Sequence, residues 1–135
     1  MDTISIQEQA RRKSISSHAR RLILDNLTVQ DSDETSLLLH HENFYLQISF
    51  SELHPLMVLH LARGLDKAGT PKIKALLNDL NLNSVLGGHA INEQIGFYTY
   101  RAAQWLETEI TLSRFHEILE RCMEEAQRGY SLLAA

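Results

Sequence analysis

The chain is poor in cysteine and in long apolar runs. Its single cysteine, Cys122, excludes an internal disulfide framework and any zinc site built on cysteines, as is usual in a reducing compartment. No apolar run approaches the about 20 residues that cross a bilayer. The stretch from Met1 to Ser17 is polar and lacks the apolar core of a secretory signal. We therefore expect a cytoplasmic protein that does not enter a membrane.

Common catalytic strings are also missing. The sequence holds no GxxxxGK[ST], GxGxxG, GxSxG or HExxH, so phosphate-cradling, dinucleotide, hydrolase and zinc-protease functions have no support from motifs. His40 and His41 are adjacent in an expected strand, where neighbouring side chains point to opposite faces and cannot share a metal ion. His116 and Glu120 are interpreted as an exposed polar pair on a helix, and Cys122 as a buried structural thiol. We expect no enzymatic activity, no metal and no cofactor.

What the chain does have is the composition of an ordinary folded protein. Its 135 residues are 44% hydrophobic and 22% charged, which predicts one domain over residues 1–135 with one core. The formal charge of -4 argues against binding of duplex nucleic acid by phosphate neutralisation.

The charge is unevenly distributed. Basic side chains gather near the N-terminus, while residues 107–125 hold six glutamates. The attraction between these charges predicts that the first and last helices lie near each other or face acidic and basic parts of a partner. The basic side chains surround the helix without interleaved aromatics, so a small DNA-binding or regulatory protein is the alternative hypothesis rather than the first. They are Arg11, Arg12, Lys13, Arg20 and Arg21.

The first half of the chain predicts a helix followed by three strands. Ser5 and Glu8 form a capping box for a helix that ends near Asn26, before a polar loop over residues 30–34. Two strands, 36–41 and 44–50, flank a two-residue hairpin turn at Glu42-Asn43, in which Asn43 can take a positive φ. A third run, 56–62, is apolar on both faces, as in a central strand.

The second half predicts a helix, a hairpin and a final helix. Thr70-Pro71 opens the second helix, Gly87-Gly88 leads into strands near 89–92 and 97–106, and the last helix begins at Thr111. The order helix, three strands, helix, two strands, helix predicts a single α+β domain with a mainly antiparallel sheet. Three helices cannot easily cover both faces of this sheet, and uncovered apolar surface usually binds protein.

The second half resembles the class I type III secretion chaperones. The matching residues are Leu76-Leu77-Asn78-Asp79-Leu80-Asn81, Gly87-Gly88, Trp105-Leu106, and Leu112 with Phe115 and Leu119. The match in pattern covers about residues 70–133, and the rest matches in layout. The chain is most similar to the single-effector chaperones of plant pathogens. It departs from the family in its basic first helix and in having Glu42-Asn43 where a glycine turn is common.

The resemblance implies a homodimer and an effector partner. The second helix and neighbouring strands would form the dimer interface, to which we assign Ile73, Leu76, Leu77 and Leu80. The N-terminal segment of one cognate effector would wind around the dimer in extended form and be kept stable and ready for export. For contact with this effector we predict side chains of the sheet and the first helix, because aromatic anchors commonly dominate interfaces. These are Leu22, Phe44, Leu46, Tyr98, Tyr100 and Trp105.

Overall fold

Each of the three helices begins behind a hydroxyl side chain that accepts a hydrogen bond from a backbone N–H. Ser5 accepts from Glu8 N at 3.1 Å, Thr70 from Ile73 N at 3.4 Å and Thr111 from Arg114 N at 3.1 Å. All three caps are confirmed. The reciprocal half of the expected capping box does not form, because the Glu8 carboxylate binds the guanidinium groups of Arg11 and Arg12 instead.

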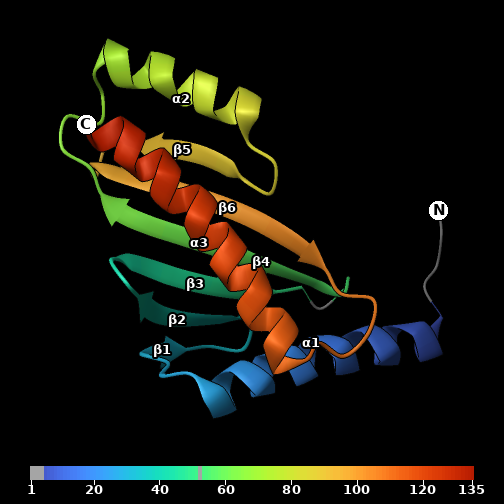
Figure 1. The fold of residues 1–135 in the computed structure, drawn as a ribbon. Helices are drawn as coiled ribbons and strands as arrows, with labels where there is room; N and C mark the ends of the chain where they lie inside the picture. Colours follow the sequence, from blue (N-terminus) through green and yellow to red (C-terminus); the bar gives the residue numbers. More distant parts are fainter. Residues whose placement is uncertain (1–4, 52) are drawn as a thin grey trace.

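The protein is described by a computed structural model over residues 5–51 and 53–135 (Figure 1). The expected α+β class and the order of the elements are confirmed, with one added strand. The elements are α1 (Ile6–Asn26), β1 (Asp31–Ser32), β2 (Ser36–His41), β3 (Phe44–Phe50), β4 (Leu56–Gly64), α2 (Pro71–Asn83), β5 (Gly88–Asn92), β6 (Phe97–Trp105) and α3 (Leu112–Ala134).

The six strands form one antiparallel sheet in the order β1-β2-β3-β4-β6-β5. The run that is apolar on both faces becomes β4, which lies in the middle of the sheet between β3 and β6. This position agrees with the prediction of a central strand, and β4 and β6 contribute side chains to the middle of both faces of the sheet.

The strand β1 replaces part of the expected polar loop. Its two side chains are exposed, so the sequence has no apolar alternation that would predict the strand. It is held by its backbone, since Gln30 N donates to Leu38 O and Asp33 N donates to Ser36 O. The Asp33 carboxylate also accepts hydrogen bonds from the amides of Thr35 and Ser36, which lower its pKa.

The hairpin between β2 and β3 turns where expected, but with a different residue in the unusual conformation. Glu42 has a φ of 55°, whereas the φ of Asn43 is not positive as predicted. A β-hairpin turn of two residues commonly needs a positive φ at its first central position, and here that position falls on Glu42.

The helices leave one face of the sheet uncovered. Figure 1 shows α3 crossing one face of the sheet, α1 running past the start of α3 near β1 and β2, and α2 lying beside β5 at the opposite edge. Alternate strand residues on the face under α3 are fully buried and form the core with α1 and α3. No helix of the described residues is long and apolar enough to cross a membrane.

Candidate functional site

The face of the sheet turned away from α3 is a surface that the described helices leave accessible, and it carries several large apolar side chains among polar ones. We call it the open face and define it by the outward side chains of β2, β3, β4 and β6, all of which are exposed or half-buried. Its apolar members are Leu38, Tyr45, Leu56, Val58, Ala62, Phe97, Ala103 and Trp105.

Strand pairing fixes how these side chains are arranged, because residues directly opposite each other on neighbouring strands share a face. Leu56 pairs with Trp105 at one end of the open face. Near the other end the rings of Tyr45 and Phe97 stack with centroids 6.4 Å apart. Between these two ends lie small side chains together with Gln47, His60 and Arg101. The open face thus offers two groups of large anchors separated by a partly polar centre.

The centre of the open face is cationic. Arg101 pairs across the strands with His60 and is exposed. Partial burial and the charge of Arg101 lower the pKa of His60, which disfavours the charged form of this imidazole. Among the described strands, the register places only one carboxylate on this face, that of Asp31 on the edge strand β1. The central charge of the face is therefore positive and belongs to Arg101.

Four of the six side chains predicted to contact a partner are instead fully buried in the chain's own core. Phe44, Leu46, Tyr98 and Tyr100 each have 0% exposure. They alternate with exposed or half-buried residues in β3 and β6, and α3 covers the face on which they lie. They are not accessible to a partner in this structure, and this part of the expectation is corrected.

The other two predicted contacts remain accessible. Trp105 is 50% exposed on the open face, where its ring lies 5.8 Å from that of His54. Leu22 is half-buried on α1. The accessible candidates on the open face that the prediction missed are Leu38, Tyr45, Val58 and Phe97, together with Arg101. The signal that could have found them is alternation, since Phe97, Arg101 and Trp105 have the same parity in β6.

The residues expected at a dimer interface divide in a similar way. Ile73 is buried in the core of its own chain, so its proposed place in the interface is corrected, while Leu76, Leu77 and Leu80 are half-buried. The more accessible apolar side chains lie at the end of α2 and just after it. They are Leu82, Val85 and Leu86.

The segment that presents Val85 and Leu86 is anchored on one carboxylate. Glu125 of α3 accepts hydrogen bonds from the backbone N–H groups of Val85, Leu86 and Gly87 at 2.9–3.3 Å. It also accepts from the hydroxyls of Ser84 and Tyr100. Partial burial alone would raise the pKa of Glu125, but the hydrogen bond from Tyr100 and those from the loop amides and Ser84 lower it to about 2.

A second polar pair lies beside this anchor. The buried ring of His89 makes a 2.6 Å hydrogen bond through Nδ1 with the hydroxyl of Tyr98, and burial lowers the pKa of His89. The backbone of His89 is bound on its outer edge by the side-chain amide of Asn81, which both donates and accepts. Asn81 therefore joins α2 to the free edge of β5.

The basic side chains of α1 are largely used within the chain. Arg11 donates to Glu107 O at 3.0 Å, Arg12 to Leu53 O at 2.9 Å and Arg20 to Asp33 O at 2.8 Å. These bonds tie α1 to three loops at one end of the sheet. They confirm that the first helix lies near the start of the last one, although the contacts are with the loop before α3 rather than with its glutamates.

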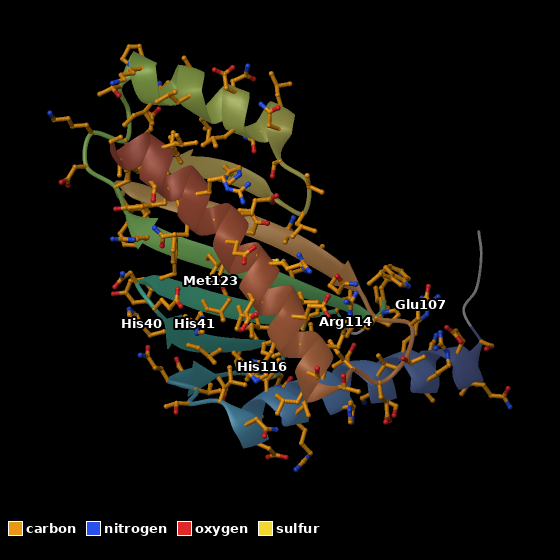
Figure 2. All side chains as sticks on the ribbon, in the orientation of Figure 1. His40, His41, Glu107, Arg114, His116 and Met123 are labelled. Atoms are coloured by element: carbon orange, nitrogen blue, oxygen red, sulfur yellow. The ribbon has the colours of Figure 1, made fainter. Side chains whose placement is uncertain are left out.

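The residues considered for metal binding do not form a site. His40 and His41 lie at the end of β2, and His116 lies on α3 near its start (Figure 2). Across residues 5–51 and 53–135, no group of three or more His, Cys, Asp and Glu side chains is placed to hold a metal ion. His116 and Glu120 are exposed, as expected. Cys122 is buried as expected, and burial raises the pKa of its thiol.

Comparison with known proteins gives relatives by structure but not by sequence. No protein-family model matches the chain, and no curated protein matches it by sequence. The solved structures that it resembles include YbjN of E. coli, a proposed transcription regulator, with a TM-score of 0.64 at 10% identity over 84% of this chain and 87% of that one.

Two other similar structures come from chaperone complexes. A chain of the HopA1–SchA chaperone–effector complex has a TM-score of 0.57 at 16% identity, covering 95% of this chain and 98% of that one. A chain of the complex between the Yersinia pestis type III secretion chaperone SycH and a stable fragment of YscM2 has a TM-score of 0.58 at 12% identity, covering 84% and 98%. The chain thus has the fold found in class I type III secretion chaperones.

Proposed function

We propose that this protein is a cytoplasmic type III secretion chaperone that binds the N-terminal segment of one cognate effector and keeps that segment stable and ready for export. The observation that carries the proposal is the open face, an apolar sheet surface with aromatic side chains at both ends and no helix of its own chain over it. The chaperone–effector complexes among the similar structures support the same role.

The physical requirement for such a chaperone is a large accessible surface. Ordering tens of residues of an unfolded segment costs conformational entropy, so the segment must bury much apolar area in return. Tyr45, Phe97 and Trp105 supply rigid anchors, because aromatic side chains bury a large area for few rotatable bonds. Binding of this kind needs no catalytic group and no nucleotide, in keeping with a protein that is not an enzyme.

We further propose that the working form is a homodimer held through α2. The half-buried Leu76, Leu77 and Leu80 form an apolar stripe on this helix that packs partly against the core of its own chain. Leu82, on the other side of the helix, and Val85, in the loop after it, add apolar side chains that are 75% and 85% exposed. A stable interface of this type buries about 1,200 Å² or more in total. A second copy of the chain would cover these side chains and leave the open face of each protomer free.

A regulator acting through the basic first helix is the second candidate, since YbjN shares the fold. Two observations on α1 weigh against it. The guanidinium groups of Arg11, Arg12 and Arg20 are bound to backbone carbonyls of the same chain, which leaves them poorly placed to neutralise phosphates. Only Lys13 and Arg21 of the basic cluster lack such contacts in the described chain.

The proposal is tested by purifying tagged protein from its native host during active secretion and measuring the mass of the intact complex. We expect two copies of the chain with one copy of an exported protein, bound through the N-terminal part of that protein. Limited proteolysis should protect this part in the complex. If nucleic acid co-purifies with the chain, and if the retardation of DNA by the chain weakens as the salt concentration rises, the regulator would be favoured.

A further inference from the structure

Among the residues that the structure describes, Arg101 has no ion-pair partner, and it lies in the middle of the open face. No described residue forms an ion pair or a side-chain hydrogen bond with its guanidinium, whereas Arg11, Arg12 and Arg20 are all engaged within the chain. Its cross-strand neighbours are His60 on one side and Gly88 on the other. Arg101 thus has a ring on one side and no side chain on the other, and the residue is exposed to an incoming group.

The position of Arg101 is regular with respect to the aromatic anchors. In β6 it lies four residues after Phe97 and four before Trp105, so all three side chains point to the open face. At about 3.3 Å per strand residue, the guanidinium lies about 13 Å from each anchor along the strand. The strand therefore displays an aromatic, a cation and an aromatic in a row about 26 Å long.

The charge on this face is not balanced by its surroundings. The one carboxylate that the register places on the described part of the face, Asp31, lies four strands away from Arg101, or about 19 Å at the usual strand spacing. An apolar partner placed over the face would strip water from the guanidinium without replacing its hydrogen bonds, and this costs free energy. A partner with a carboxylate at that point would supply two hydrogen bonds in a fork.

The secondary structure of such a partner follows from the surface. The face of a sheet offers no backbone hydrogen bonds, which are available only along strand edges. A segment lying on the face must satisfy its own backbone, as an α-helix does, and helices are the usual second layer on a sheet. At 1.5 Å per residue, a helix of about 17 residues spans the distance from Phe97 to Trp105.

From these observations we infer that the open face binds an amphipathic helix of the exported partner, with apolar residues at both ends of its contact stripe and a carboxylate near the middle that pairs with Arg101. This inference rests on the proposed function and specifies the chemistry of the partner. Aromatic and arginine side chains at the centre of an interface are the residue types that most often dominate its affinity.

The test uses 18-residue helical peptides and the emission of Trp105, the only tryptophan of the chain. The first peptide has a leucine stripe with one central glutamate, the second has glutamine at that position, and the third has the same composition as the first with the glutamate moved to the opposite side of the helix. Each is titrated into the native protein, Arg101→Gln and a control, Arg121→Gln, which removes an exposed arginine from α3.

We expect the first peptide to shift Trp105 emission and to bind the native protein about tenfold more tightly than the other two. Arg101→Gln should reduce this ratio to about one, and Arg121→Gln should leave it unchanged. High salt should weaken the preference, because it screens the ion pair.

Three results would overturn the inference. Equal binding of all three peptides with a Trp105 shift would make the face an apolar helix site in which Arg101 has no role, and the proposed function would stand. If Arg101→Gln still prefers the peptide with the central glutamate, a cation other than Arg101 pairs with that glutamate. Binding of a single-stranded oligonucleotide in place of the peptides would assign Arg101 to phosphate, and it would count against the proposed function as well.

Discussion

The hydroxyl of Tyr100 donates a 2.7 Å hydrogen bond to Oε1 of Glu125. This bond links the strand β6 to the helix α3 beside the loop between α2 and β5. The same carboxylate binds the loop that leads out of α2. Gly87 in that loop has no room for a side chain, since a Cβ there would lie 2.7 Å from the Tyr100 ring and 2.5 Å from Arg101 O. The position of α2, and with it the proposed dimer surface, depends on this pair.

Glu125→Gln should lower the free energy of unfolding by about 1–2 kcal/mol at pH 7. The amide keeps one acceptor oxygen but loses the charge that strengthens the hydrogen bonds from Tyr100 and the loop, and partial contact with water limits the loss. Urea unfolding measures the effect. Glu124→Gln, which changes an exposed neighbour, should have an effect near zero. Equal stability of the two variants would mean that the anchor contributes little.

The same variant predicts a specific dependence on pH. The pKa of Glu125 is lowered from 4.5 to about 2 in the folded chain, so its stabilising effect is complete above about pH 4.5 and is lost as the pH falls toward 2. The difference in unfolding free energy between native protein and Glu125→Gln should therefore shrink across this window. Glu8, whose pKa is also about 2, is present in both proteins and cancels in the difference. A difference that stays constant down to pH 2 would contradict the assignment.

Gly129→Ala should destabilise the protein although alanine is the better helix former. A Cβ at position 129 would lie 2.6 Å from the His89 ring and 3.1 Å from the Tyr98 hydroxyl, both held in place by their hydrogen bond. We expect the free energy of unfolding to fall by about 1–3 kcal/mol, as at other overpacked sites. At an exposed helix position the same substitution would raise it by about 1 kcal/mol. Gly64→Ala is the control, because nothing lies within 4 Å of its Cβ. A stabilised Gly129→Ala would show that His89 moves aside easily.

Substitutions in β6 should separate the two faces of the sheet. Tyr98→Asp buries a carboxylate in the core and should unfold the protein, with a loss of about 4 kcal/mol or more. Trp105→Asp, on the open face, should leave circular dichroism unchanged and remove binding of the exported partner. If Tyr98→Asp folds normally and Trp105→Asp binds normally, the assignment of the two faces is wrong.

Light scattering tests the dimer. The native protein should give twice the chain mass of 15.4 kDa at micromolar concentration, and the double variant Leu82→Glu with Val85→Glu should shift toward the mass of a single chain. Ile95→Glu adds a charge at another exposed apolar side chain, in the β5–β6 turn, and should leave the native mass unchanged. A native protein that scatters as a single chain would contradict the proposed homodimer.

Local features of the sequence were enough to predict most elements of the fold. Hydroxyl caps at Ser5, Thr70 and Thr111 placed the helix starts, and the turn at Glu42-Asn43 and the pair Gly87-Gly88 placed the strands that follow them. The strand β1 was missed because backbone pairing and the Asp33 turn hold it, while its side chains show no pattern.

The candidate site was harder to predict for a different reason. Alternation divides β6 into two faces but does not say which face a distant helix covers, and both faces of β6 have aromatic residues. Tyr98 and Tyr100 were therefore assigned to the partner, and they lie under α3. Glu125 gave no sign of its role, because its hydrogen bonds come from a loop about 40 residues earlier in the chain.

The central claim is most directly tested by quantitative mass spectrometry of proteins that the native host secretes, with and without the gene for this chain. The account predicts that one exported protein disappears from the culture medium and is depleted inside the cell, while other exported proteins keep their levels. The native gene should restore this protein and the Trp105→Asp gene should not. An unchanged set of secreted proteins in the strain that lacks the gene would contradict the role of this protein as a secretion chaperone.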